Sequence, residues 1–285
     1  MLIRNISAPD LLFKFTLFLA LIILLISSWD APISGDEYVH VKQAEKNINY
    51  IKTLGNDKEA LVTPISRLKH YGQSFDTLTT WIVNIFEIDN LYRVRHVSNA
   101  VVAWGIILFT SLITLKISQS KLAAFITVIL FLISARFMGH AMNNLKDIPF
   151  AFAFIFSIYF IFRFAIKLPG ISWINLLLLT QGIAFGISIR IGGLLIFAYF
   201  ILFTGLYLYF LIVSGEIKKD LILKLSLKLG ILSFFVLLIS YFTSILIWPY
   251  ALENPLLNPK ASLDLMHQYP TTVRQIFEGK LFWSD

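Results

Sequence analysis

Residues 11–29 of the chain read LLFKFTLFLALIILLISSW, an apolar stretch that decides the class of fold. A bilayer core of about 30 Å is crossed by roughly 20 helical residues, so a stretch of this length predicts a membrane span. The stretch contains Lys14 and ends at Trp29 without the small-x-small pattern of a cleavage site. We therefore interpret it as an uncleaved span and not as a signal peptide.

Six more apolar runs follow, and the composition agrees with them. Of 285 residues, 57% are hydrophobic and 14% charged, with a mean hydropathy of +0.75, which is more apolar surface than a soluble domain of this length can bury. No low-complexity tract indicates a fibrous or disordered chain, and the absence of cysteine excludes disulfides and thiol chemistry. We predict an all-α polytopic membrane protein, a single domain over 1–285 with seven spans at about 11–29, 97–115, 122–137, 148–164, 173–189, 193–213 and 229–248.

The connections between these spans differ in charge from one side to the other. One set, the N-terminal tail with 116–121, 163–167 and 216–228, holds ten basic and three acidic residues. The other set, which includes 30–95 and the tail from 249, holds 14 of each. The positive-inside rule predicts that the first set is cytoplasmic. The excess of positive charge is spread over short loops and forms no single basic face, which disfavours nucleic-acid binding.

The predicted outer loop, residues 30–95, is too long for a simple connection. Two sets of apolar residues in it each fall on one helical face, namely Tyr38, Val41, Ile48 and Ile51, and Phe75, Leu78, Ile82 and Ile85. We expect two helices that lie flat on the outer membrane surface or beneath it against the bundle. The outer tail, 249–285, has no closing span, as in a truncated chain.

Two acids, Asp36 and Glu37, follow the first span. Ser34-x-x-Glu37 fits a capping box, and Asp36 suits the positive end of a helix. A carboxylate at the outer end of a membrane span is also suited to act as a base on a substrate hydroxyl. We favour the functional interpretation for Asp36, and for Glu37 both interpretations stay open.

A second polar cluster joins the third and fourth predicted spans. Asp147 is placed to cap the fourth span, with Pro149 in its first turn. A cap needs no histidine or asparagine beside it, so we favour a functional role for Asp147. Both a structural and a functional interpretation stay open for its neighbours His140, Asn143, Asn144 and Lys146.

Arg190 lies at the predicted outer turn between two spans and precedes Gly192 and Gly193. Its planar guanidinium offers several hydrogen-bond donors to phosphate oxygens, which favours a binding role. The alternative interpretation is a side chain that only extends its charged end to the membrane surface. His70 is a loop histidine, a type of residue that is most often a bystander. The histidines lack ligand spacing, so we predict no metal ligands, although a divalent metal stays open as a cofactor. We interpret the remaining outer basic residues as solvated surface or lipid anchors, namely Arg67, Lys69, Arg93 and Arg95.

These candidates all fall on the side that is neutral in charge, which predicts one outward-facing site. A carboxylate there would deprotonate an acceptor hydroxyl while a cation stabilises a departing phosphate. The acidic pair Asp36-Glu37 with His40, the Asn-x-x-Asp-x-Pro-Phe stretch at 144–150 and the Arg-x-Gly-Gly stretch at 190–193 resemble GT-C glycosyltransferases. The resemblance is to family 39, the protein O-mannosyltransferases, and to the bacterial aminoarabinose transferases. In layout it covers most of the chain.

The resemblance implies inverting transfer of one sugar from a polyprenyl-phosphate donor to a protein, lipid or glycan acceptor outside the cytoplasm. It implies Asp36 as the catalytic base, Glu37 and Asp147 as positioning groups, and Arg190 or Lys146 as phosphate ligands. His70-Tyr71-Gly72 departs from the family's proline pair, which puts His70 as a donor contact in doubt. The bacterial plasma membrane is the expected location.

Two other functions stay open from the sequence. A transporter or flippase for a lipid-linked or anionic substrate would need charged or helix-breaking residues near the bilayer midplane, and the span centres are nearly free of charge. A non-catalytic membrane assembly subunit would not account for the acids and cations that gather on one side.

Overall fold

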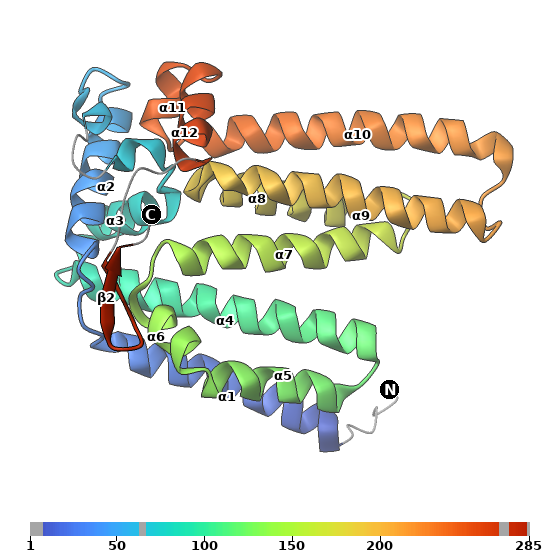
Figure 1. Cartoon of the computed structure of the whole chain (residues 1–285), viewed down its shortest axis with the longest axis horizontal. Helices are drawn as coiled ribbons and strands as arrows, with labels where there is room; N and C mark the ends of the chain where they lie inside the picture. The colour runs from blue at the N-terminus through green and yellow to red at the C-terminus, as the bar shows by residue number, and fades with distance from the viewer. Residues whose placement is uncertain (1–7, 63–66, 268–273, 284–285) are drawn as a thin grey trace.

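The structure is a computed structural model that describes residues 8–62, 67–267 and 274–283. Its longest elements are apolar helices, and shorter helices and one hairpin complete it (Figure 1). The elements are α1 (Ala8–Trp29), α2 (Glu37–Lys52), η1 (Glu59–Leu61), η2 (Leu68–His70), α3 (Ser74–Phe86), α4 (Leu91–Ser118), α5 (Lys121–Ile133), α6 (Ala135–Asn143), α7 (Asp147–Ala165), α8 (Trp173–Ile189), η3 (Ile191–Gly193), α9 (Leu194–Val213), α10 (Lys219–Ile245), α11 (Pro249–Glu253), α12 (Leu257–His267), β1 (Arg274–Phe277) and β2 (Lys280–Trp283).

The seven predicted apolar runs are helical, six as single helices and the third as two, which confirms an all-α polytopic membrane protein. Within the described residues, α1, α4, α7, α9 with η3, and α10 are long and apolar enough to cross a membrane. The pair α5 and α6 would be a sixth span, and α8, with 17 residues, is a shorter apolar helix. Two predicted boundaries were too narrow, because α4 begins at Leu91 and α10 at Lys219.

The third predicted span is not one straight helix. It breaks at Ser134, and the axes of α5 and α6 differ in direction by 72°. Ser134 has an extended backbone, and its hydroxyl accepts from the Phe137 N–H as the cap of α6. A serine that caps the next helix ends the previous one. The bend directs α6 across the end of the bundle (Figure 1).

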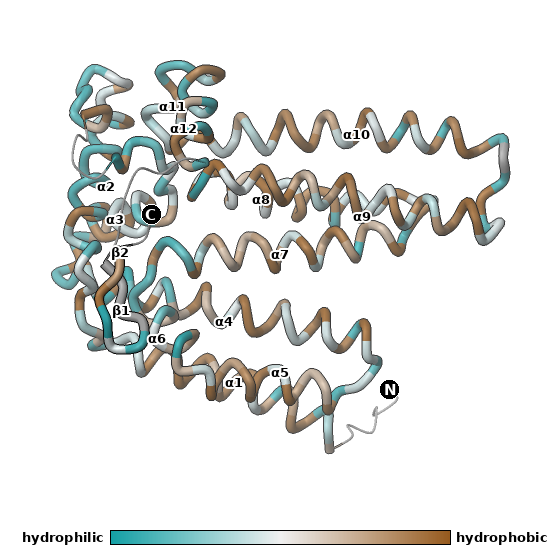
Figure 2. The backbone as a smooth tube through the Cα atoms, viewed as in Figure 1, coloured by the Kyte–Doolittle hydropathy of each residue, from teal (hydrophilic) through white to brown (hydrophobic). Residues whose placement is uncertain are grey.

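The long helices run side by side, and the shorter elements α2, α3, α6, α11, α12 and the hairpin gather at one end (Figure 1). The long helices are mainly hydrophobic along their length, whereas this end is rich in hydrophilic residues (Figure 2). Because the chain alternates in direction along the bundle, the connections predicted to share the outer side lie together here. Helix α1 begins at the opposite end.

The two amphipathic helices expected in the 30–95 loop are present as α2 and α3. In α2, Val41 and Ile48 are buried as expected, but Tyr38 is exposed. In α3 the exposed side carries Ile82 and Ile85, and the buried side is largely polar. A helix that turns its apolar side outward fits the interface of a bilayer.

The turn that carries Arg190 depends on glycine. A Cβ on Gly193 would lie 2.3 Å from the backbone of Gly186, so η3 folds back directly against the end of α8. Close backbone approach through small residues is a common way to pack membrane helices. Here it fixes Arg190, which links α8 to η3, at the polar end of the bundle.

Candidate active site

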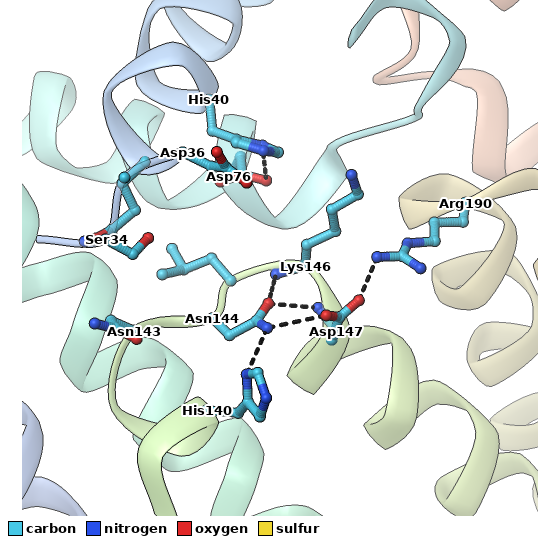
Figure 3. A pocket seen from close by; sticks show the side chains of 13 residues that line it. Ser34, Asp36, His40, Asp76, His140, Asn143, Asn144, Lys146, Asp147 and Arg190 are labelled. Carbon is cyan, nitrogen blue, oxygen red and sulfur yellow. Dashed lines mark hydrogen bonds and ion pairs between the residues drawn. The ribbon is translucent and has the colours of Figure 1, made fainter. Parts of the chain in front are cut away.

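A cavity of about 540 Å³ opens at the polar end of the bundle (Figure 3). It lies where the start of α2, the buried face of α3, the α6–α7 connection and the end of α8 meet. The residues that line it are Ser34, Gly35, Asp36, Glu37, His40, Asp76, His140, Asn143, Asn144, Leu145, Lys146, Asp147 and Arg190. Eight of the nine predicted site residues are in this set; His70 is the exception.

Asp36 precedes the first turn of α2, where its backbone carbonyl accepts from the N–H groups of Val39 and His40. The residue is exposed to the cavity, and its side chain makes no cap hydrogen bond. Within the described parts of the chain, its carboxylate forms no hydrogen bond and no ion pair. An acid in this state is able to accept a proton from a bound hydroxyl.

Glu37 has a different environment although it is the next residue. Its carboxylate accepts from the Ser34 N–H at 2.9 Å, which is the glutamate half of the capping box, and lies 2.9 and 3.0 Å from His96 Nε2. The side chain is buried. Glu37 therefore ties the start of α2 to α4, and this fixes the segment that carries Asp36.

A buried ion pair forms the base of the cavity, and the sequence interpretation missed it. Asp76 on α3 accepts from Arg95 Nη2 at 2.6 Å, and its other oxygen lies 3.6 Å from His40 Nδ1. Arg95 on α4 is 0% exposed, which corrects its interpretation as solvated surface or a lipid anchor. Burial raises the pKa of Asp76, but the hydrogen bond from His40 and the charge of Arg95 outweigh it, so the pKa lies below its ordinary value.

The start of α7 is capped by Asn144 and not by Asp147. The Asn144 side-chain oxygen accepts from the N–H groups of Lys146 and Asp147, and its amide donates to Asp147 Oδ2 at 3.0 Å (Figure 3). Asp147 is thereby left to pair with Arg190 across the cavity. The capping role considered for Asp147 from the sequence thus belongs to its neighbour.

The other two candidates of this connection fix its position. His140 Nδ1 lies 2.9 Å from the Asn144 amide, and Asn143 donates to the carbonyl of Pro32 at 2.8 Å. The second contact fastens the end of α6 to the segment that leads into α2. The two chain segments that carry Asp36 and Asp147 are therefore held against each other.

Lys146 is a half-buried cation in the cavity wall. Its Nζ lies 3.5 Å from the centre of the Tyr71 ring, and no carboxylate of the described chain lies within ion-pair distance. Burial, and then the nearby charge of Arg190, lowers the pKa of Lys146 to about 8. Asp147, Asp76 and Asp36 oppose this shift. A cation with a displaced pKa in a cavity is a common mark of a functional site.

His70 is separated from the other candidates. It does not line the cavity, its Nδ1 lies 3.2 Å from the Ser262 hydroxyl, and its ring packs edge-on against Tyr250. Burial lowers its pKa, as do the charges of Lys69 and Arg67. The structure thus gives His70 a packing role between η2 and α12.

Among the residues that the structure describes, no three His, Asp or Glu side chains come together as a set able to hold a metal ion. Three of the four acids that line the cavity instead have basic side chains of the described chain as partners. Histidines and carboxylates also lie in pairs there, as in His40 with Asp76.

A helical membrane bundle that gathers acids and cations in one cavity at its end is consistent with a GT-C-type membrane glycosyltransferase. The chain belongs to the dolichyl-phosphate-mannose-protein mannosyltransferase family, whose sequence model matches residues 14–257. The family identifies the chain as an integral membrane glycosyltransferase of the kind that uses a polyprenyl-phosphate sugar donor. Comparisons with curated proteins and with solved structures give no match.

Proposed function

We propose that the protein transfers a single sugar, with inversion, from a polyprenyl-phosphate donor to a hydroxyl of an acceptor, and that Asp36 is the general base. The acceptor is in general a protein in this family, and we propose the same class here. We propose that the reaction takes place outside the cytoplasm, because the positive-inside rule favours an outward orientation of the cavity end of the bundle.

One observation carries the choice of base: Asp36 is the carboxylate of the cavity that has no partner among the described residues. Three other carboxylates line the cavity, and each is engaged: Glu37 by His96, Asp76 by Arg95 and Asp147 by Arg190. A carboxylate that accepts hydrogen bonds from a cation gains stability in its charged form and becomes a poorer proton acceptor. Asp36 keeps its lone pairs for a substrate.

In an inverting transfer, the acceptor oxygen attacks the anomeric carbon of the donor as the bond to the phosphate breaks. The acceptor proton passes to Asp36, and the electron pair of the broken bond stays on the phosphate oxygen of the lipid. The charge that develops there needs a cation, and the cavity wall holds two candidates, Lys146 and Arg190. Glu37 and Asp147 hold the two segments in place.

The test is sugar transfer by purified protein from a labelled polyprenyl-phosphate donor, compared between the wild type and Asp36→Asn. The amide has the shape of the acid but cannot take the proton, so we expect transfer to fall by about 10²- to 10⁴-fold with donor affinity within about twofold. Asp264→Asn is the matched control, because Asp264 is exposed on α12, away from the cavity lining, and pairs with Lys260. An unchanged rate in Asp36→Asn would remove Asp36 from the mechanism.

The same experiment bears on the non-catalytic interpretation. A membrane assembly subunit would bind no donor and transfer no sugar in the wild type. Transfer that Asp36→Asn abolishes, with bound donor retained, would exclude that interpretation.

A further inference from the structure

The segment at 70–73 departs from the proline pair that the family resemblance implies, and its Tyr71 contacts the cations of the cavity. The Lys146 ammonium lies 3.5 Å from the centre of the Tyr71 ring, and the Arg190 guanidinium carbon lies 6.0 Å from it. An ammonium at this distance over an aromatic face is attracted by the negative face of the ring.

The position of Tyr71 is set by neighbours on both sides of it. The indole N–H of Trp248, which is buried, donates to the carbonyl of Lys69 at 2.7 Å. On the other side, a Cβ on Gly72 would lie 1.9 Å from the carbonyl oxygen of Ser188, so the backbone at Gly72 packs directly on the end of α8. This is the end of α8 that leads to Arg190, and Tyr71 therefore keeps a fixed position relative to both cations.

The two cations are not equivalent. The Arg190 guanidinium is paired with Asp147 and also lies 5.5 Å from the Phe150 ring. In the described chain Lys146 has no carboxylate partner, and its charge is stabilised by a ring that cannot accept its protons as a carboxylate does. A cation held in this way stays available to an anion, because no acid has to be displaced first.

We propose that Tyr71 is a positioning residue that holds the Lys146 ammonium ready for the phosphodiester of the donor. This inference rests on the function proposed above and specifies which cation contacts the phosphate. Tyr71 acts through Lys146 and does not itself touch the reacting atoms. Arg190, through its pair with Asp147, fixes the opposite part of the wall.

The test is a double-mutant cycle on donor affinity, measured by displacement of labelled polyprenyl-phosphate sugar from purified protein. We expect Lys146→Met and Tyr71→Leu each to weaken donor binding by about tenfold, the order of one charge-assisted hydrogen bond. In the Lys146→Met background, Tyr71→Leu should have no further effect, because Tyr71 acts through the ammonium. Tyr71→Phe keeps the ring and should bind the donor within about twofold of the wild type.

Three results would overturn the proposal: an additive effect in the double variant, unchanged affinity in Tyr71→Leu, or the same loss in Tyr71→Phe. Inorganic phosphate forms a separate arm of the experiment. It should not displace the donor at concentrations where polyprenyl phosphate does. Equal potency of the two compounds would overturn the proposal that the site recognises a lipid-linked phosphate.

A measurement on the wild type covers the case in which Tyr71→Leu does not fold. Bound donor should protect Lys146 from an amine-specific reagent, as read by mass spectrometry, while the exposed Lys260 is modified equally with and without donor. Lack of protection would refute the contact between Lys146 and the phosphate. Neither experiment depends on Asp36, so failure here and failure of the proposed base are distinguishable.

Discussion

Raising the pH from 7 to 9 should weaken donor binding through one residue of the cavity. The pKa of Lys146 is lowered to about 8, first by burial and then by the charge of Arg190. The carboxylates that face it, Asp147, Asp76 and Asp36, raise its pKa and limit the fall. Because the pKa of this cation is lowered, its charge is present below about pH 8 and is lost as the pH rises through that value.

The size of the effect follows from the pKa of Lys146. With a pKa of about 8, the ammonium is roughly 90% charged at pH 7 and roughly 10% charged at pH 9. The phosphodiester of the donor carries one negative charge over this whole range. If the neutral lysine binds the donor about tenfold more weakly, as we expect for Lys146→Met, donor affinity falls by about fivefold between these two pH values.

The assay is equilibrium binding of labelled donor across this pH range, so that no catalytic step contributes. In Lys146→Arg the cation stays charged throughout, and donor affinity should not change between pH 7 and 9. In Lys146→Met, donor affinity should be weak and should also be independent of pH. A flat wild-type curve would refute the reasoning, and so would a Lys146→Arg curve that falls as the wild type does.

Two further substitutions test how the structure holds the site. Gly72→Ala would place a Cβ 1.9 Å from the Ser188 carbonyl oxygen, so we expect a loss of about 1–3 kcal/mol in stability, seen in thermal unfolding, together with weaker donor binding. Gly139→Ala is its control, because a Cβ there has nothing within 4 Å and alanine favours a helix, so the unfolding temperature should hold or rise. Asn144→Ala removes the cap of α7 and should cost about 1 kcal/mol, while Asn144→Ser, which keeps a cap oxygen, should recover most of it; equal unfolding temperatures would contradict the cap.

The sequence predicts the helices of the bundle well and their ends less well. Apolar runs identify α1, α7, α8 and α9 within a few residues, because lipid requires apolar side chains along the whole span. The break at Ser134 escapes the same analysis, since the predicted span was extended to Phe137 across Ser134 and Arg136, past the bend. The local signals were a serine able to cap a helix and a charged residue, Arg136, shortly after it.

Helix α3 shows why part of the site was missed. Its apolar residues Leu78, Ile82 and Ile85 share one face, as the periodicity predicts, yet that face is exposed and Asp76 lies on the buried one. The pattern gives the direction of the apolar face but not what that face meets. At the end of a membrane bundle, the apolar side of a helix can face lipid while its polar side faces a cavity. The usual assumption that the apolar side is the buried one is then reversed.

Arg95 was missed for a related reason. The sequence places it before the expected start of the second span at residue 97, where basic residues commonly anchor to lipid headgroups. In the structure α4 begins at Leu91, and the extra turns direct Arg95 inward to Asp76. A shift of six residues in a helix boundary thus separates a surface cation from a buried one.

The pairing of charges in the cavity explains why we assign the catalytic and phosphate-binding roles to two side chains. Three acids are matched with basic partners, in the pairs Asp76 with Arg95, Asp147 with Arg190 and Glu37 with His96. In the described chain this leaves Asp36 without a cation and Lys146 without a carboxylate. A sugar transfer from a lipid phosphate needs one group of each kind, a base for the hydroxyl and a cation for the phosphate. The engaged residues then serve to hold the segments, so their loss should lower stability and activity together. Asp36 and Lys146 make no such internal pair, and their substitution should lower function while the unfolding temperature stays close to that of the wild type.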